Sequence, residues 1–455
     1  MKVKAVILAA GEGKRMKSDL PKPLHRLCGR PLVQWAMASV SGCDPNPVVV
    51  VGHGAEQVKE ALASSGAAFA EQREQKGTGH AVMMAREQIA DADAILVVAG
   101  DMPLIRPETI AALVEGVADG NDITMLTVVA PNPTGYGRVL RNETGAIVAI
   151  VEQRDATPAQ QCICEVNTSV YCFRRETLFK ALGQLKADNA QGELYLTDAI
   201  KLTAEAGGTI NAVQGDFTEG MGINDRAQLA EAAAVLRARI NRTHLLNGVT
   251  LIDPQQTYID WDVRIGRDTV VYPGNTLETG TVIGEGCTLY PGSRIAQSTI
   301  GNDVEITSSV ITETTIGDHC HIGPFAYTRP GSRIGSDVKI GDFVEIKNAT
   351  IGDDTKISHL TYVGDADVGR NVNLGCGVVF SNYDGQNKYR STVEDGAFIG
   401  CNTNLVSPVH VGKNAYTAAG STITEDIPDD ALAIARSRQT NKEGWVTRRK
   451  GGNNK

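Results

Sequence analysis

Hydrophobic and polar residues in the first half of the chain form two alternating patterns. Short apolar runs occupy residues 4–10, 47–52, 94–101 and 122–129, and amphipathic stretches with helical spacing occupy residues 31–40, 56–66 and 107–117. Apolar runs that alternate with amphipathic helices through short loops are typical of an α/β domain with a mostly parallel sheet. We therefore predict such a domain over residues 1–226, with its ligands at the carboxyl ends of the strands.

A single helix is predicted to connect this domain to the rest of the chain. Asp225 is a suitable N-cap for it. Apolar residues then recur at three- and four-residue spacing on one face, at Leu229, Ala233, Leu236 and Ile240. At 1.5 Å per residue, roughly 20 residues give an arm of about 30 Å. We assign residues 227–247 to this linker helix and interpret it as a spacer between domains.

Beyond residue 248 the hydrophobic pattern has a period near six. An Ile-Gly or Val-Gly pair begins at residues 265, 283, 300, 316, 322, 334, 340, 351, 363, 368, 399 and 411. A coil of three short flat sides, with one hexapeptide per side, has this period, whereas a helix or a simple strand does not. The aliphatic residue of each pair would point into the prism, and the small residue would let the corner turn. We predict a parallel β-helix within residues 248–455, followed by a disordered basic tail from residue 446.

The composition of the chain limits the cellular compartments and the binding partners that we expect for the protein. The 455 residues suffice for two or three domains, and the net charge of −9 argues against general binding to nucleic acid or anionic membranes. Nine cysteines are scattered without zinc-type spacing, which favours reduced thiols in a cytoplasmic protein. The first apolar run, from Ala5 to Ala10, is too short for a signal sequence or a membrane span.

This first apolar run leads into a glycine-rich loop. Gly11 and Gly13 can let backbone N–H groups approach phosphate oxygens closely. Residues 1–30 hold eight Lys or Arg residues and two acidic ones, so the loop is a basic patch in an acidic chain. Met16 replaces the third glycine of the dinucleotide-binding fingerprint, and the spacing does not fit a Walker A loop. The sequence therefore indicates a phosphate site of another kind.

Two motifs at this loop, GEGKRM at 11–16 and PKPL at 21–24, resemble the signature of the nucleotidyltransferases that make nucleotide sugars. The resemblance implies a Rossmann-like domain. It continues through a uracil-reading segment at Gln72 and 77–80, a metal-binding motif at 99–101 and sugar contacts at 135–138. The residues that it implies for UTP and the sugar phosphate are Leu8, Ala9, Ala10, Gly11, Arg15, Lys22, Gln72, Gly77, Thr78, Ala99, Gly100, Asp101, Gly137, Glu152, Asn167 and Asn224.

These residue types suit uridylyl transfer. A sugar-1-phosphate oxygen attacks the α-phosphorus of UTP and pyrophosphate leaves, so catalysis is mainly positioning and charge clamping. Arg15 and Lys22 are expected to hold the phosphates, and Asp101 and Asn224 offer hard oxygen ligands for Mg²⁺. The alternative for these two ligands is a cap or turn residue. Relatives often carry an aromatic residue where Ala99 stands, so the wall of the sugar pocket is expected to differ here.

The β-helix also carries polar residues that a scaffold alone does not need. They are Arg329, Lys347, His359, Tyr362, Asn373, Asn382, Tyr383 and Arg436. With roughly 18 residues per coil, the first three can stack on neighbouring coils. The alternative is that the histidine is a satisfied corner residue and that the two cations are solvated surface residues.

The segments FAYTRPGS, SHLTYVGD and FSNYDGQNKY resemble the acetyltransferase half of a bacterial bifunctional family. Its members combine N-acetylglucosamine-1-phosphate uridylyltransferase and glucosamine-1-phosphate N-acetyltransferase activities, and the resemblance is nearly full length. It implies a left-handed β-helix of hexapeptide repeats and a homotrimer with the active site between adjacent prisms. The substrates that it implies are UTP, acetyl-CoA, glucosamine-1-phosphate and N-acetylglucosamine-1-phosphate.

This second resemblance also assigns roles to single residues. His359 is the general base that takes a proton as the sugar amine attacks acetyl-CoA, a task that suits imidazole. The sugar phosphate is assigned to Arg329 and Lys347, and the sugar to Tyr362 and Asn373. Acetyl-CoA is assigned to Cys376, Asn382, Tyr383, Cys401, Ala419 and Arg436. The family is expected to carry alanine at 376 and serine at 401, so the two cysteines keep a backbone role or a packing role.

Three hypotheses follow for the function. The first is a two-reaction enzyme of UDP-N-acetylglucosamine synthesis. The second keeps the nucleotidyltransferase and treats the β-helix as an oligomerisation or regulatory module, which has no need of the SHLTY and NYDG segments. The third is a non-catalytic subunit that binds nucleotide or protein, which would be expected to lose GEGKRM, Lys22 or Asp101, whereas all three are present.

Overall fold

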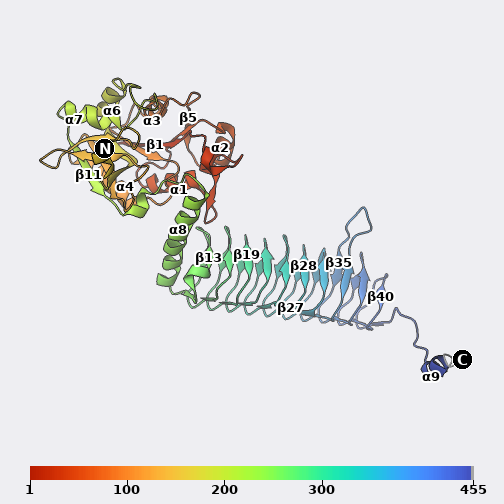
Figure 1. Cartoon of the computed structure of the whole chain (residues 1–455). Helices are drawn as coiled ribbons and strands as arrows, with labels where there is room; N and C mark the ends of the chain where they lie inside the picture. The colour runs from red at the N-terminus through yellow and green to blue at the C-terminus, as the bar shows by residue number, and fades with distance from the viewer. Residues whose placement is uncertain (452–455) are drawn as a thin grey trace. The chain divides into compact units, whose positions relative to one another are not determined.

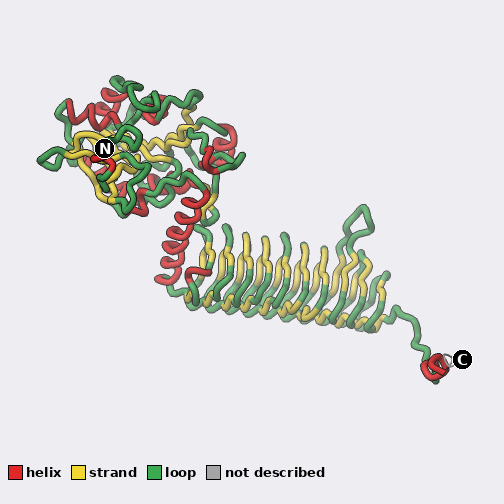
Figure 2. Tube along the Cα trace, in the orientation of Figure 1, coloured by secondary structure: helices red, strands yellow, loops and turns green. Residues whose placement is uncertain are grey.

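The computed structural model describes residues 1–451 of the chain, drawn in Figures 1 and 2. It divides into two compact units, Met1–Arg239 and a second that begins at Ile240. In the described residues, no helix is both long and apolar enough to cross a membrane. The division falls inside a helix, within the residues 227–247 that the sequence assigns to the linker helix.

The first unit is built on one twisted, mostly parallel sheet. Its main path runs β11 (Ile210–Gln214), β7 (Ile123–Val129), β10 (Glu165–Arg174), β6 (Ala94–Ala99), β1 (Val3–Ala9), β4 (Val48–Val51) and β5 (Ala68–Glu71). Only β10 on this path runs antiparallel to its neighbours, and the hairpin of β8 (Arg138–Arg141) and β9 (Ile147–Val151) extends from it. The mostly parallel sheet predicted from the sequence is confirmed.

Helices cover both faces of this sheet, because alternate residues of each strand point to opposite sides. Ile7 of β1 belongs to the core shared with α1 (Leu32–Val40), α2 (Ala55–Ala61) and α4 (Pro107–Ala118). Val6 belongs to the core shared with α3 (Thr78–Met84), α6 (Arg175–Leu182) and α7 (Asp198–Glu205). The predicted alternation of strands and helices is confirmed by β1, β4, β6 and β7 and by α1, α2 and α4.

The long helix α8 spans Arg226–Leu246. Asp225 caps it as predicted, since its Oδ1 accepts from the Gln228 backbone N–H at 2.9 Å. Of the four apolar residues predicted to share one face, Leu236 is buried, and the other three are half-buried. Ala232 is the other fully buried apolar residue of this helix.

The second unit is a parallel β-helix. Thirty short strands, from β12 (Thr250–Leu251) to β41 (Leu432–Ala433), form three parallel sheets of 11, 10 and 9 strands. Figure 1 shows the coils stacked in order along the prism. Strands that pair lie one coil apart, as in Val270↔Thr288, and their inward side chains form one continuous hydrophobic core. The fold predicted from the six-residue period is confirmed.

The glycines of most Ile-Gly pairs are required by the approach of neighbouring coils. A Cβ atom on Gly266 would lie 2.6 Å from the carbonyl of Gly284, and one on Gly352 would lie 2.6 Å from the carbonyl carbon of Gly369. Neither Gly266 nor Gly352 has a positive φ; Asp268 and Asp354, two residues later, adopt it instead. The sequence predicts that the glycine of each pair makes the turn. In these two coils the residue with the turn conformation is instead the aspartate two positions after the glycine.

Two segments depart from the regular coil. β32 (Ala366–Val368) pairs with β35 (Ser391–Val393) in the register Ala366↔Ser391, and the extra residues project as a loop near β35 (Figure 1). The sequence predicts a disordered tail from residue 446, but residues up to 451 form the short helix α9 (Trp445–Gly451). Its Arg449 guanidinium lies over the Trp445 ring at 5.1 Å. Residues 452–455 lie outside the described part.

Candidate functional site

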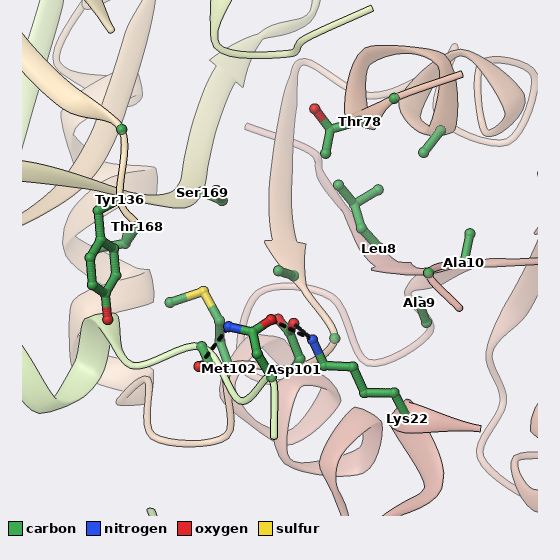
Figure 3. Close-up of a pocket in the computed structure, with 18 of the residues that line it drawn as sticks. Leu8, Ala9, Ala10, Lys22, Thr78, Asp101, Met102, Tyr136, Thr168 and Ser169 are labelled. Atoms are coloured by element: carbon green, nitrogen blue, oxygen red, sulfur yellow. Dashed lines mark hydrogen bonds and ion pairs between the residues drawn. The ribbon is translucent and has the colours of Figure 1, made fainter. Parts of the chain in front are cut away.

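A cavity of about 540 Å³ opens at the carboxyl ends of β1 and β6 in the first unit. All sixteen residues assigned individually to UTP and the sugar phosphate line it, whereas Gly79, His80 and Arg138 of the two longer segments are not among its lining residues. Figure 3 shows Leu8, Ala9 and Ala10 along one side and Tyr136, Thr168 and Ser169 along the other, with Asp101 and Lys22 joined below them. Segments far apart in the sequence therefore meet at the edge where parallel sheets bind ligands.

The glycine loop places Lys22 at this cavity. Gly13 has a φ of 65°, and a Cβ atom there would lie 2.6 Å from the Lys22 Cβ. Glycine is needed for both reasons, because a side chain would be strained and would also collide. The short helical turn η2 (Lys22–Leu24) then carries the lysine, whose side chain is 13% exposed.

The ammonium of Lys22 joins the two predicted metal ligands. It donates to Asp101 Oδ2, and its Nζ lies 3.1 Å from Asn224 Oδ1. The two ligands are also linked through the backbone, since the Ile223 N–H donates to the Asp101 carbonyl at 3.0 Å. Two oxygen atoms from distant parts of the chain thus converge on one cationic group.

This oxygen pair fits a hard divalent cation such as Mg²⁺, which binds few protein oxygens and keeps water or phosphate in its other positions. Within the described residues, no group of three or more His, Cys, Asp or Glu side chains is placed to hold a metal ion. A cation here would therefore complete its coordination with water or with phosphate oxygens of a substrate.

The sugar end of the cavity is built from β8, β9 and β10. The Asn167 backbone N–H donates to the Gly137 carbonyl at 2.8 Å, and its side-chain amide donates to the Tyr171 hydroxyl at 2.7 Å. Glu152 follows β9, and burial raises the pKa of its carboxyl, with the charges of Asp155 and Asp198 adding to that shift. A hydroxyl bond from Thr197 at 3.4 Å opposes the shift. Glu152 therefore accepts a proton more readily than an ordinary glutamate.

The structure adds lining residues that the sequence did not reveal. They include Gln75, Thr168, Ser169, Glu193 and Gln228. Ser169 has a φ of 62° at the register shift of β10, and Gln75 donates to the Ala10 carbonyl at 2.8 Å. Both placements depend on strand pairings that no local motif signals. Arg138, grouped with the sugar contacts in the sequence, is instead 1% exposed and donates to Gln153 Oε1 at 2.7 Å.

The second site follows one corner of the β-helix. His359 ends β30 (Lys356–His359) and pairs in register with Asp342, the last residue of β27 (Lys339–Asp342). Backbone hydrogen bonds connect this corner to the same corner of the following coils. The N–H groups of Gly377, Asn402 and Gly420 donate to the carbonyl oxygens of His359, Cys376 and Cys401, respectively. The histidine and the residues predicted for acetyl-CoA, Cys376, Cys401 and Ala419, thus lie on successive coils at one corner.

Asp342 orients the histidine. Its Oδ1 lies 2.6 Å from His359 Nδ1, and this bond lowers the pKa of the Asp342 carboxyl. A carboxylate accepts, so Nδ1 carries the proton and Nε2 is left as the basic nitrogen. The histidine side chain is 59% exposed, so Nε2 is accessible to a ligand. Sequence reasoning missed Asp342, although its place one coil before the histidine is a usable signal.

Asp365, also missed, gathers three further residues. Lys347 at the end of β28 (Glu345–Lys347) lies 2.9 Å from Asp365 Oδ2, and Asn382 donates to the same oxygen. Burial raises the pKa of Asp365, but hydrogen bonds from Asn348, Lys347 and Asn382 outweigh it and the net pKa is lowered. The cluster therefore fixes Lys347 beside an ionised carboxylate. Lys347 pairs in register with Gly364, at the end of the strand that follows His359, so it lies at the next corner of the coil.

The other predicted residues lie at several places along the coils. Tyr362 begins β31 (Tyr362–Gly364), and its hydroxyl lies where a side chain on Gly364 would be. Arg329 lies one coil before Lys347 and binds Glu345 at 2.9 Å. Asn373 is on the sheet that carries His359, in β33 (Asn373–Leu374). Tyr383 lies in the projecting loop, and Arg436 packs beside Gly420.

Family comparisons match both units. The model of the MobA-like NTP transferase domain matches residues 5–195. The model of the bacterial transferase hexapeptide (six repeats) matches residues 262–297 and 313–348. The first range holds most of the cavity residues, and the second ends just before His359.

Curated relatives match over nearly the whole chain. Proteins described as bifunctional protein GlmU are 53% identical over 449 residues in Acetivibrio thermocellus, 52% over 448 residues in Geobacillus sp. and 49% over 445 residues in Clostridium kluyveri. Each alignment covers 97% or 98% of both proteins. The similarity therefore includes both units.

Proposed function

Because the chain belongs to the GlmU family of bifunctional proteins, we propose that it makes UDP-N-acetylglucosamine in two reactions. Glucosamine-1-phosphate is acetylated by acetyl-CoA at the β-helix corner, and the product receives a uridylyl group from UTP in the cavity of the first unit. The observation that carries this proposal is the presence of two separate constellations, Lys22 with Asp101 and Asn224, and His359 with Asp342.

For uridylyl transfer, the first unit supplies positioning and positive charge. The sugar phosphate oxygen attacks the α-phosphorus and pyrophosphate leaves, so negative charge accumulates on phosphoryl oxygens. Lys22 and Arg15 hold those oxygens, and Gly11 lets the backbone approach them. Mg²⁺ is the expected cofactor, held by Asp101 and Asn224, and it supplies charge neutralisation when bound. Glu152 and Asn167 orient the sugar.

For acetyl transfer, His359 is the general base. The sugar amine attacks the thioester carbonyl carbon, Nε2 takes the amine proton, and the thiolate of coenzyme A leaves. Asp342 holds the Nδ1–H side and stabilises the imidazolium that forms. Lys347 is a strong cation for the sugar phosphate, because its bond to Asp365 raises its pKa. The coenzyme is proposed to bind along the coils that carry Cys376, Cys401 and Ala419, where a backbone N–H group would stabilise the thioester oxyanion.

Two point variants test the assignment. In the full-length protein with UTP, Mg²⁺, acetyl-CoA and glucosamine-1-phosphate, His359→Ala should lower coenzyme A release by about a hundredfold or more and leave uridylyl transfer to added N-acetylglucosamine-1-phosphate intact. Asp101→Ala should do the reverse. Undiminished acetylation in His359→Ala would remove the histidine from its role as base. Absence of both activities in the wild type would overturn the proposal as a whole.

The two other hypotheses fit less well. A monofunctional pyrophosphorylase with a β-helix module for oligomerisation is not favoured, because the bifunctional relatives align over both units. A non-catalytic subunit does not need Lys22, Asp101 and Asn224 to converge. Incubation with acetyl-CoA and glucosamine-1-phosphate alone separates the first two hypotheses directly.

The active assembly is proposed to be a homotrimer that works in the cytoplasm. An exposed apolar ladder supports association, since the rings of Phe325 and Phe343 stack at 5.4 Å and both residues are more than half exposed. Leu360, the next residue after His359, extends this ladder and is 57% exposed. All nine cysteines are free thiols, as expected in a reducing compartment.

A further inference from the structure

The amide of Gln72 is held by two partners in the wall of the first cavity. The residue is 5% exposed, and its Nε2 lies 2.9 Å from the Gly77 carbonyl oxygen and 3.1 Å from His80 Nδ1. A backbone carbonyl can only accept a hydrogen bond. The end of the amide that faces Gly77 must therefore be the nitrogen, which fixes the orientation of the side chain independently of any assignment of its atoms.

This orientation determines the state of His80. An amide nitrogen only donates, so His80 Nδ1 must accept and the proton of the neutral ring must lie on Nε2. The two hydrogens of Gln72 are then both used, one by Gly77 and one by His80. Its Oε1 has no hydrogen-bond partner among the described residues, and Gln72 lines the cavity. What Gln72 offers to a ligand is thus an acceptor without a donor.

We propose that His80 is a positioning residue for base selection: it keeps the Gln72 donor turned away, so that the cavity presents a lone acceptor to the pyrimidine. A ring nitrogen that carries hydrogen, as in the imide edge of uracil, can donate to that acceptor. Cytosine has an unprotonated nitrogen at the same ring position, whose lone pair would face Oε1. The inference rests on the proposed function, because it takes a uridine nucleotide as the ligand of this cavity.

His80 acts here through Gln72 and not through the nucleotide. Without an acceptor at His80, one hydrogen of the buried amide is left unpaired, and only the Gly77 carbonyl still opposes the turn of the amide nitrogen toward the ligand, so the orientation is less strongly held. The residue therefore controls the choice between UTP and CTP more than the rate of transfer. A purely structural role would lower the use of both nucleotides together.

The test compares kcat/KM for UTP and for CTP in the full-length protein with N-acetylglucosamine-1-phosphate and Mg²⁺. In His80→Phe, which keeps a ring but has no acceptor, the UTP/CTP ratio should fall by about tenfold or more. In His80→Asn, whose Oδ1 can take the place of Nδ1, the ratio should stay near that of the wild type. His80→Leu provides a second variant without an acceptor if the phenylalanine variant does not fold.

A double-variant cycle shows whether the effect passes through the amide. Gln72→Met removes the acceptor and should lower the ratio by itself, and His80→Phe should then cause no further change in the ratio. An unchanged ratio in folded His80→Phe, or an equal change in the Gln72→Met background, would overturn the role of His80. If the wild type transfers no uridylyl group at all, the proposed function fails first, and coenzyme A release shows that the chain is folded.

Discussion

Lys22 occupies the position between Asp101 and Asn224 that a divalent cation is expected to share. The ammonium satisfies both oxygens in the chain alone, so a metal ion must compete with it for them. In the proposed reaction, the phosphates of a bound nucleotide would offer the ammonium an alternative partner. One lysine would then couple the state of the two proposed metal ligands to the presence of substrate.

This competition predicts that removal of the Lys22 ammonium strengthens Mg²⁺ binding and weakens catalysis. In Lys22→Met, Mg²⁺ without nucleotide should raise the melting temperature more than it does in the wild type, because the ammonium no longer occupies the Asp101 and Asn224 oxygens. Uridylyl transfer should nevertheless fall by about a hundredfold or more, since a charge on the phosphates is lost. Calorimetric melting with and without Mg²⁺, together with pyrophosphate release, measures both effects. An equal Mg²⁺ shift in both proteins would contradict the competition.

Glu152 gives a pH-dependent prediction. Burial raises its pKa above the ordinary value of 4.5, so the folded state binds this proton more tightly than the unfolded state. The stability that this proton contributes is fully present below pH 4.5 and is lost as the pH rises through the folded pKa. Glu152→Gln should therefore melt about 2 °C or more above the wild type at neutral pH and match it in acid. A constant difference at all pH values would show that ionisation is not the cause.

At the scale of elements, the β-helix depends on glycines that let coils approach each other. Gly352→Ala would force a methyl group against the Gly369 backbone, where no side chain can yield, and should cost several kcal/mol. Gly274→Ala is the matched control in the same unit, because its Cβ would lie 3.6 Å from the nearest atom and only its positive φ of 80° is strained. That control should cost about 1 kcal/mol. Urea unfolding followed by circular dichroism compares the two, and equal losses would refute the steric explanation.

The elements differ in how far the sequence alone could predict them. The period of six predicts the β-helix because each coil repeats one local pattern, and the alternating runs predict β1, β4, β6 and β7 for the same reason. Asp342 and Asp365 were not predicted, since they matter only through the residues that stack on them one coil away. Ser169 enters the first cavity through a register shift in β10 that only pairing with β7 creates. A local repeat can be recognised in the sequence, whereas these contacts form only when strands that are distant in the sequence pair in the folded protein.

Arg138 shows that a residue within a functional motif can also lie away from the site. The sequence groups it with Gly135 and Gly137 as a sugar contact, yet its guanidinium is buried and serves the Tyr136 carbonyl and Gln153. The glycines reach the cavity because the backbone itself faces it, and Gly137 has Ile150 within 2.9 Å of the position of a Cβ. A motif therefore identifies the strand end, but the alternation of side chains across the sheet decides which residues of the motif face the ligand.

At the scale of the whole molecule, the product of the first proposed reaction is a substrate of the second, but the two proposed sites have no residues in common. In the proposed scheme, the acetyl transfer that His359 assists converts the sugar amine to an amide, and the cavity of the first unit then receives the acetylated sugar phosphate. The first unit has its cavity within one chain, whereas His359 lies on an exposed corner beside the apolar ladder of Phe325, Phe343 and Leu360. An exposed corner needs a second surface to enclose a substrate, so the two activities should depend differently on association.

Breaking the ladder should separate assembly from uridylyl transfer. Phe343→Asp places a charge in the centre of the ladder, which should give monomers by light scattering and lower acetylation by about a hundredfold, because a misplaced partner surface no longer positions the substrate. Uridylyl transfer should change less than about threefold, since its cavity lies within one chain. Tyr290→Asp is a matched control, because Tyr290 stacks on Tyr272 at 5.4 Å on earlier coils and should leave the trimer intact. Monomers of Phe343→Asp that acetylate at the wild-type rate would show that one prism suffices, and trimers of this variant would move the interface to another face of the β-helix.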